Sequence, residues 1–280
     1  MTEWDGTDYA QISALQKVMA DEALSLLNLE ASERILDVGC GDGKITAQIA
    51  ARLPSGSVVG VDPSVEMIEY ARTHWLTEQH SNLGFEVADA RRLPFREEFD
   101  LVVSFNALHW IPQSEQPQAL QSIRFAMRSG ATAQLRLVAK GERKSLEDVL
   151  EETRLSPRWS QYYRDFHDPY LHLTPEDYAA LAEKVGFNVR SLNVTDKSWD
   201  FSSRSGFFAF GSVTFVEWTQ MLPDAEKPAF INDVLDRYRV IAGDDHTFKF
   251  YQMDIRLARL KRGLGGLPKY ADRYPSLEKL

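Results

Sequence analysis

The chain has 280 residues, of which 44% are hydrophobic and 26% are charged, and its formal net charge at pH 7 is −9. These values are typical of a globular protein and exclude a disordered, collagen-like or disulfide-stapled chain. Cys40 is the single cysteine in the sequence, so an internal disulfide cannot form. The acidic balance argues against a protein that binds duplex nucleic acid over its whole surface.

The two ends of the chain bear on location and on partners. The opening residues, MTEWDGTDYAQ, are polar and acidic, and no apolar run approaches the length of about 18 residues that a membrane span needs. We therefore expect a cytoplasmic protein without a secretory signal or a membrane span. Residues 255–275 hold six basic residues and one acidic residue. This balance favours a solvated face or tail, with an anion-binding patch as the alternative.

The first half of the chain alternates helical and strand-like patterns. Apolar positions at near-helical spacing predict a first helix over 8–29. Short apolar runs, typical of buried strands, then alternate with amphipathic segments. The predicted strands are 35–38, 57–61, 84–88, 100–104 and 132–139, and the helices between them are 44–53, 64–74 and 117–127. This order predicts an α/β fold, a doubly wound parallel sheet that binds its ligand beyond the carboxyl ends of the strands.

The second half is less regular. Thr174 and Pro175 begin a helix that Gly186 ends. A strand at 188–194, helices at about 204–221 and 224–242, and a last strand within 247–260 follow. Because no segment has the composition of a linker, we predict one domain with a helical cap inserted into it. Its predicted parts are the domain 1–261, with a cofactor-binding core at 30–140 and cap insertions at 141–170 and 202–245, and a tail at 262–280.

A glycine-rich loop follows the first predicted strand, in the sequence DVGCGDGK from Asp37 to Lys44. Glycines after a strand let the backbone turn sharply and approach a ligand closely. The spacing D-x-G-x-G-x-G differs from the G-x-G-x-x-G of nucleotide dehydrogenases, because Lys44 stands where the third glycine would be. A Walker phosphate loop does not occur either. Asp37 and Asp42 would repel a pyrophosphate, so the loop favours a ligand that carries cationic groups.

Two further carboxylates stand at the ends of neighbouring predicted strands. Asp62 ends the second strand, 19 residues after Gly43, where a carboxylate can accept from both hydroxyls of a ribose. Asp89 follows the third strand and can accept from an adenine amino group. Together with the loop, these residues predict S-adenosylmethionine as the cofactor. The alternative is that they are strand-end caps and turn residues without a ligand.

The segments ILDVGCGDGKIT, VVGVDPSVEMIEYAR, EVADARRLPF and FDLVVSFNALHWIP resemble the motif series of class I S-adenosylmethionine-dependent methyltransferases, over about residues 30–140. The resemblance implies a Rossmann-like seven-stranded sheet whose last strand is antiparallel. It implies a methionine end held at 37–41, a ribose at Asp62, adenine near Met67 and Asp89, and a sulfonium near Ser104. The cofactor-binding residues predicted in this way are Asp37, Gly39, Cys40, Gly41, Asp62, Pro63, Met67, Asp89, Ala90 and Ser104.

A narrower resemblance concerns the acceptor. SFNALHWIP and the later FVEWTQMLP are similar to segments of juvenile hormone acid and trans-aconitate methyltransferases. Tyr9, Ser13 and Gln16 resemble the entry helix of the hormone enzymes, although an Asn usually stands at the Ser13 position. In that group the residues that match Gln16 and Trp110 contact the substrate carboxylate. The malonyl-carrier-protein methyltransferases are similar by pattern, and all three groups methylate carboxylates.

His109, Trp110 and Gln16 are therefore the candidate catalytic residues. A carboxylate acceptor is already ionised at pH 7 and needs no general base. We expect His109 to line the pocket or donate a hydrogen bond; a base role would indicate a different acceptor, and plain packing is a third reading. Trp110 could instead be a core residue and Gln16 a surface residue. We expect no metal site.

The predicted function is methyl transfer from S-adenosylmethionine to a small molecule, at a carboxylate oxygen. The expected partner is an apolar or amphipathic carboxylic acid, with no nucleic acid and no membrane, and the expected state is a monomer or homodimer. One alternative is a macromolecular acceptor, meaning a protein, a carrier protein or RNA. RNA is disfavoured because the fourth strand ends in SFNA, not in the N-P-P-Y type of tetrapeptide of base N-methylation. The other alternative is a catalytically silent scaffold that keeps the cofactor fold.

Overall fold

The computed structural model describes residues 6–76 and 81–260, with side chains for Leu15 and, in these ranges, from Lys17 onward. The chain divides into two compact units. The first, here called the sheet unit, contains Glu22–Ala139, Leu171–Val194 and the chain from Met253. The second, here called the helical unit, contains the chain up to Asp21, Lys140–Tyr170 and Thr195–Gln252. The predicted insertions at 141–170 and 202–245 fall in the helical unit, and the predicted tail at 262–280 lies outside the described residues.

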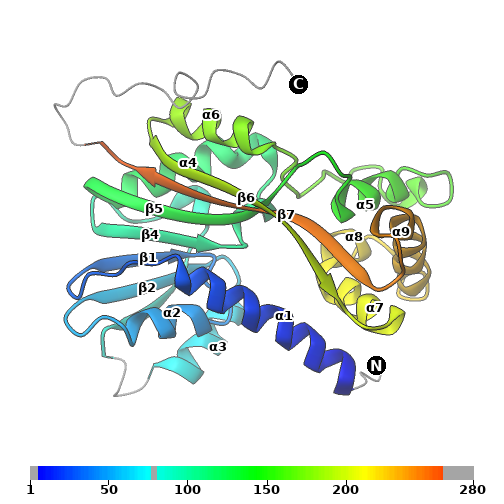
Figure 1. Ribbon diagram of the computed structural model, residues 1–280, viewed down its shortest axis with the longest axis horizontal. Helices are drawn as coiled ribbons and strands as arrows, with labels where there is room; N and C mark the ends of the chain where they lie inside the picture. The colour runs from blue at the N-terminus through cyan, green and yellow to red at the C-terminus, as the bar shows by residue number, and fades with distance from the viewer. Residues whose placement is uncertain (1–5, 77–80, 261–280) are drawn as a thin grey trace. The chain divides into compact units, whose positions relative to one another are not determined.

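A seven-stranded sheet with the strand order β3-β2-β1-β4-β5-β7-β6 forms the frame of the fold (Figure 1). The five strands from β3 to β5 are parallel, and β7 is antiparallel, so the predicted doubly wound mixed sheet is confirmed. Both β6 and β7 contribute residues to both units. The strands are β1 (Arg34–Val38), β2 (Ser57–Asp62), β3 (Leu83–Val87), β4 (Phe99–Phe105), β5 (Met127–Ala139), β6 (Asn188–Asp200) and β7 (Thr247–Ala258).

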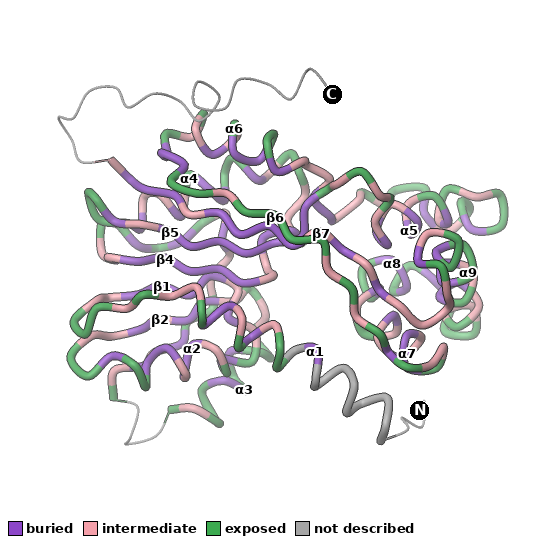
Figure 2. The backbone as a smooth tube through the Cα atoms, in the orientation of Figure 1, coloured by how far each residue is buried: buried purple, intermediate pink, exposed green. Residues whose placement is uncertain are grey.

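Alternation along the central strands gives the sheet unit two apolar faces. Ile35 and Val103 belong to one buried cluster, whereas their strand neighbours Leu36 and Val102 belong to the other, as the period of two in a strand requires. The end of α1 and helices α2 and α3 cover the first face, and α4 and α6 cover the second (Figures 1 and 2). These helices are α1 (Gly6–Ser25), α2 (Lys44–Ala50), α3 (Val65–Trp75), α4 (Gln116–Ala126) and α6 (Pro175–Val185).

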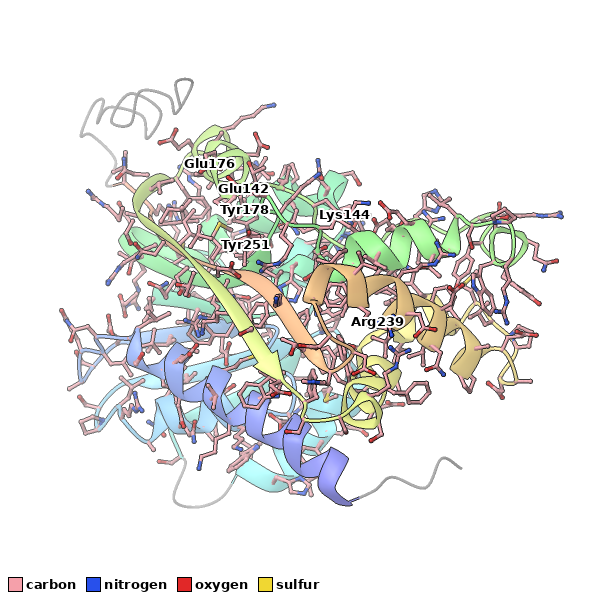
Figure 3. The ribbon with its side chains drawn as sticks, turned by 45° about the vertical axis from the view of Figure 1, so that its right-hand side comes forward. Glu142, Lys144, Glu176, Tyr178, Arg239 and Tyr251 are labelled. Atoms are coloured by element: carbon pink, nitrogen blue, oxygen red, sulfur yellow. The ribbon has the colours of Figure 1, made fainter. Side chains whose placement is uncertain are left out.

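The helices begin and end where local chemistry dictates. The Ser64 side chain accepts the Met67 N–H and caps α3, and Thr174 caps α6 in the same way through Asp177 N–H. Helix α6 buries Tyr178 against the sheet and leaves Glu176 exposed on the same helix (Figure 3). Gly186 ends α6 with a φ of 100°, as predicted.

The helical unit is built from α5 (Leu146–Arg154), α7 (Arg204–Thr214), α8 (Val216–Thr219), α9 (Lys227–Ala242) and parts of β6 and β7. Large aromatic side chains fill its core, and their polar atoms find partners inside the unit. The indole N–H of Trp159 donates to Asp233 at 2.7 Å, and that of Trp218 donates to Glu151 at 2.7 Å. The predicted helix at 204–221 is divided between α7 and α8, and α5, which a capping box at Ser145 begins, has no counterpart among the predicted elements.

Within the helical unit, residues 141–143 pack closely against Tyr251 of β7. Tyr251 lies so close to Gly141 that a Cβ atom built on Gly141 would be 2.1 Å from its ring. The Arg143 guanidinium lies 4.7 Å from the centre of the same ring and forms an ion pair with Asp196 on β6. Glycine at position 141 is therefore a steric requirement of this packing.

Across the described residues, none of the helices combines the length and the apolarity that crossing a membrane requires. In the same part of the chain, no group of three or more His, Cys, Asp or Glu side chains is placed to hold a metal ion. The predicted cytoplasmic location and oligomeric state stay predictions.

An ion cluster inside the sheet unit gives a test of its packing. Arg136 on β5 is 4% exposed, and it donates from two nitrogens to Asp254 on β7, at 2.7 and 3.0 Å, and from a third to Glu22 on α1, at 3.0 Å. We expect Asp254→Ala to lower the free energy of unfolding by about 3–5 kcal/mol, because it leaves a buried guanidinium without its main counter-charge. Urea unfolding measures this loss.

The matched control is Glu22→Ala. The Glu22 side chain is 38% exposed, and Asp254 would still neutralise Arg136, so the expected loss is about 0–1 kcal/mol. Equal losses in the two variants would show that Asp254 is no more important to Arg136 than the exposed carboxylate is.

Candidate functional site

A pocket of about 400 Å³ lies in the sheet unit, at the carboxyl ends of β1, β2, β3 and β4. This volume falls in the range of about 300–1,000 Å³ that small-molecule sites usually have. The position is the one that the doubly wound topology favours, because the loops after parallel strands converge there. The lining residues are Val38, Gly39, Gly41, Asp62, Pro63, Ala88, Asp89, Ala90, Arg91, Asn106, Ala107, Leu108, Trp110 and Ile111.

The glycine loop after β1 forms one wall. Gly39 has a φ of 76°, and a Cβ atom on it would lie 2.2 Å from the Cβ of Ala107, so the loop after β4 packs directly on this backbone. Gly41 has a φ of 53°, and a Cβ atom on it would meet nothing within 4 Å. The loop is therefore closely packed at Gly39 and open toward the pocket at Gly41, where a ligand can approach the backbone.

Asp62 at the end of β2 holds this loop in place. Its carboxylate accepts the N–H of Gly41 at 3.0 Å through one oxygen and the N–H of Ser64 at 2.9 Å through the other. A carboxylate has about four acceptor positions, of which these amides take two. The arrangement can therefore organise the loop and accept from two further donors, as a pair of ribose hydroxyls would require.

Asp89, after β3, is held by the arginine two residues later. The Nε of Arg91 donates to the two Asp89 oxygens at 2.8 and 3.0 Å, and the Arg91 backbone N–H donates at 2.8 Å. These contacts lower the pKa of Asp89, so the group is an ionised acceptor at neutral pH. Arg91 also forms an ion pair with Glu115, which precedes α4.

Asp37 lies beneath the loop and does not line the pocket. Its side chain is buried and accepts a hydrogen bond of 2.7 Å from the Thr46 hydroxyl on α2. Burial raises its pKa to about 7. Its observed contact thus ties the end of β1 to α2, a structural role that the strand-end position alone did not reveal.

The other predicted cofactor residues divide in the same way. Gly39, Gly41, Asp62, Pro63, Asp89 and Ala90 line the pocket, whereas Asp37, Cys40, Met67 and Ser104 do not. The sulfur of Cys40 packs against Gly60 of β2, 3.0 Å from where a Cβ on that glycine would stand. The Ser104 hydroxyl donates to the Val38 carbonyl at 2.7 Å, and Met67 is 47% exposed on α3.

The opposite wall comes from the chain that follows β4. Asn106 has a φ of 55°, and its N–H donates to the Arg136 carbonyl at 2.7 Å. An asparagine tolerates this left-handed conformation better than most residues. Two residues beyond it, a 3-10 turn at Leu108–Trp110 places Trp110 in the lining, where the residue is 37% exposed. Trp110 therefore lies on the pocket wall, and its contact with a substrate stays a prediction.

His109 is buried behind this wall and does not line the pocket. Its Nδ1 accepts the backbone N–H of Val138 at 3.2 Å, so the proton of the neutral ring resides on Nε2. Burial lowers the pKa of His109 to about 3. A neutral imidazole whose acceptor nitrogen is already engaged is a poor general base, which argues against that role. The side chain of Gln16, the third candidate, lies outside the described residues.

Several lining residues were not singled out from the sequence. Arg91 follows Asp89 at the spacing of a local contact, and Asn106 is the kind of residue that adopts a positive φ after a strand. Both signals were present in the quoted motifs. Apolar residues such as Leu108 and Ile111 gave no comparable signal, because nothing in their pattern separates a pocket wall from the core.

The part of the chain that lines the pocket matches a known family. Residues 35–130 match the family model described as a methyltransferase domain. The chain carries a methyltransferase domain. Its cofactor is S-adenosylmethionine, as the glycine loop together with Asp62 and Asp89 predicted.

Curated relatives extend beyond this domain. The methyltransferase is 28% identical to trans-aconitate 2-methyltransferase of Deinococcus radiodurans over 186 residues, which are 65% of this chain and 69% of the relative. It is 40% identical to malonyl-[acyl-carrier protein] O-methyltransferase of Geobacter sulfurreducens over 113 residues, 37% of this chain and 39% of the relative.

A solved structure shares the fold. The phosphoethanolamine N-methyltransferase 2 of Haemonchus contortus, in complex with S-adenosyl-L-methionine, superposes with a TM-score of 0.54. The alignment covers 86% of this methyltransferase and 53% of that chain, at 18% identity. At this identity, the likeness concerns the fold alone.

Asp62 gives the sharpest test of the site. We expect Asp62→Ala to weaken binding of S-adenosylmethionine by roughly 1.5–3 kcal/mol, the scale of hydrogen bonds to a charged group. This corresponds to about a 10- to 150-fold rise in the dissociation constant, which isothermal titration calorimetry measures.

The matched control is Asp42→Ala, in the same loop. The Asp42 carboxylate accepts the Lys44 N–H at 3.0 Å and does not line the pocket, so its removal is expected to change affinity less than about threefold. Wild-type affinity in Asp62→Ala would mean that the ligand does not use this carboxylate.

Proposed function

We propose that the protein transfers the methyl group of S-adenosylmethionine to a carboxylate oxygen of a small molecule and so forms a methyl ester. The chemistry of the pocket wall carries this proposal. Among the described lining residues, the titratable side chains are those of Asp62, Asp89 and Arg91. The two carboxylates are committed to the loop and to Arg91, and His109 is neutral with Nδ1 engaged. Such a wall suits an acceptor that arrives already ionised.

The cofactor position follows from the same residues. We place the methionine end against the open backbone at Gly41, the ribose hydroxyls at Asp62 and the adenine between Asp89 and Ala90. Asp62 has acceptor positions left after its two amide contacts, and a diol supplies two donors at a matching spacing. The acids also suit the positive charges of the sulfonium and the amino group.

The reaction needs little from the protein beyond position. S-adenosylmethionine supplies an electrophilic methyl group whose leaving group is a neutral thioether. The carboxylate oxygen forms the new O–C bond as the C–S bond breaks, the electron pair remains on sulfur, and no proton moves. Holding the two groups in line and excluding water can contribute about 7–11 kcal/mol to the rate. We assign the orientation of the acceptor to Trp110, because its side chain lines the pocket and its indole carries an N–H donor.

The relatives support a carboxylate acceptor. The names of the two curated relatives above describe methylation of trans-aconitate and of a malonyl group on a carrier protein. We therefore keep Trp110 as a proposed contact of the acceptor carboxylate, and the role of Gln16 stays a prediction from the sequence. The second name describes an acceptor on a carrier protein, so a carrier-bound carboxylate is the alternative acceptor. The experiment below distinguishes it from a free acid.

Incubation with S-adenosylmethionine labelled in the methyl group, against a panel of free carboxylic acids, tests the proposal. We expect label in a small product that mild alkali releases as methanol, because a carboxyl ester hydrolyses under those conditions. Alkali-stable label would indicate an N-, C- or ether-methyl product and contradict the proposal. Label that precipitates with added carrier protein would move the acceptor to a macromolecule, and cofactor binding without turnover on any acceptor would favour a silent scaffold.

The same assay gives a pH profile. We expect kcat/KM for an acid acceptor to stay level from about pH 6 to 9, because the acceptor is ionised and the pKa of His109, about 3, lies well below this range. The control is Asp37→Asn, which removes the carboxyl whose pKa lies near 7. A rise with pH that persists in Asp37→Asn would point to a proton-losing acceptor and to a base.

A further inference from the structure

The chain between β4 and α4, together with Gln116 at the start of α4, is here called the 106–116 segment and supplies the acceptor side of the pocket. Asn106, Trp110 and Ile111 line the pocket, and two 3-10 turns, Leu108–Trp110 and Gln113–Glu115, give the segment its shape. The amides of Trp110, Ile111 and Glu115 donate within the segment, to the carbonyls three residues before each of them. Hydrogen exchange at these amides therefore reports how often the segment opens.

The Gln116 side chain and the backbone of Leu171 hold the segment by hydrogen bonds. Gln116 is fully buried, and its side-chain amide donates to the carbonyls of Leu108 at 2.6 Å and Ile111 at 2.8 Å. The N–H of Leu171 donates to the His109 carbonyl at 2.9 Å. These contacts hold the backbone of the segment at Leu108, His109 and Ile111.

An ion-pair bridge through Arg91 connects the segment, at Glu115, to Asp89 of the pocket wall. Arg91 uses one edge of its guanidinium for the Asp89 carboxylate and its remaining nitrogen for Glu115, the last residue of the second turn. The exposed fractions of the three side chains are 37% for Arg91, 32% for Asp89 and 41% for Glu115. At this exposure, water screens the charges and the bridge contributes little to stability.

We propose that Arg91 is a positioning residue which couples cofactor binding at Asp89 to the ordering of the 106–116 segment, so that the acceptor wall is set after the cofactor has bound. The inference rests on the proposed place of the adenine beside Asp89. A ligand there removes water from one side of the bridge, and an ion pair strengthens as its surroundings lose water. By linkage, a segment ordered through Arg91 also strengthens cofactor binding.

Three variants separate this role from general stability. Glu115→Gln breaks the ion pair with the segment and leaves the Arg91–Asp89 contact in place. Arg91→Met removes both contacts. Arg92→Met is the matched control, because Arg92 is the neighbouring arginine, is exposed and does not line the pocket.

The measurement is hydrogen–deuterium exchange of peptides that cover 105–116, with and without saturating S-adenosylhomocysteine, beside calorimetric dissociation constants for the same ligand. In the wild type and in Arg92→Met, we expect the ligand to slow exchange of the segment at least fivefold. In Glu115→Gln, we expect the dissociation constant to rise less than about fivefold while more than half of the protection is lost. In Arg91→Met, we expect loss of protection together with a rise in the dissociation constant of tenfold or more.

The outcomes distinguish the two proposals. Full ligand-induced protection of 105–116 in Glu115→Gln would overturn the coupling role of Arg91 and leave the proposed function intact. Binding to the wild type without any protection of the segment would do the same. Failure of the wild type to bind S-adenosylhomocysteine would instead count against the proposed function. A rescue variant, Glu115→Asp, keeps the charge and is expected to recover part of the protection, which a purely structural defect would not allow.

Discussion

The carboxylate of Asp62 is the contact on which the site depends. It ends β2 and accepts one backbone amide from the glycine loop after β1 and another from the residue that caps α3. The parallel register of β1 and β2, with Val38 beside Val61, brings these two turns to the same edge of the sheet. One side chain thereby holds two loops in a single conformation, and the backbone at Gly41 stays open to a ligand.

The pocket then has two walls of different character. The wall after β1, β2 and β3 carries acids whose oxygens accept from backbone or from Arg91, so it suits the hydroxyl, amino and cationic groups of the cofactor. The wall after β4 presents Trp110 and apolar residues, with a neutral, buried His109 behind it. A methyl transfer that requires no proton removal fits this division, because position and exclusion of water do most of the work.

Much of this could be predicted from the sequence, because buried strands and glycine turns leave local signatures. The limits of the first four strands, to within one residue, and the places of Gly41, Asp62 and Asp89 follow from such patterns, whereas β5 begins at Met127, five residues before the predicted start. The direction in which a strand-end side chain points does not follow from them. Asp37 accepts from Thr46, Ser104 donates to a backbone carbonyl, and Cys40 packs on Gly60. Their polarity alone could not distinguish these contacts from contacts to a ligand. The two compact units also left no linker signal, because β6 and β7 contribute to both.

Thermal denaturation with and without S-adenosylmethionine and S-adenosylhomocysteine tests the central claim, that the loop held by Asp62 binds this cofactor. A ligand at about 100 times its dissociation constant adds about 2.7 kcal/mol to the free energy of unfolding. We expect a clear rise in Tm with both ligands, and a much smaller rise in Asp62→Ala at the same concentrations. Unchanged Tm with both ligands in the wild type would contradict that claim.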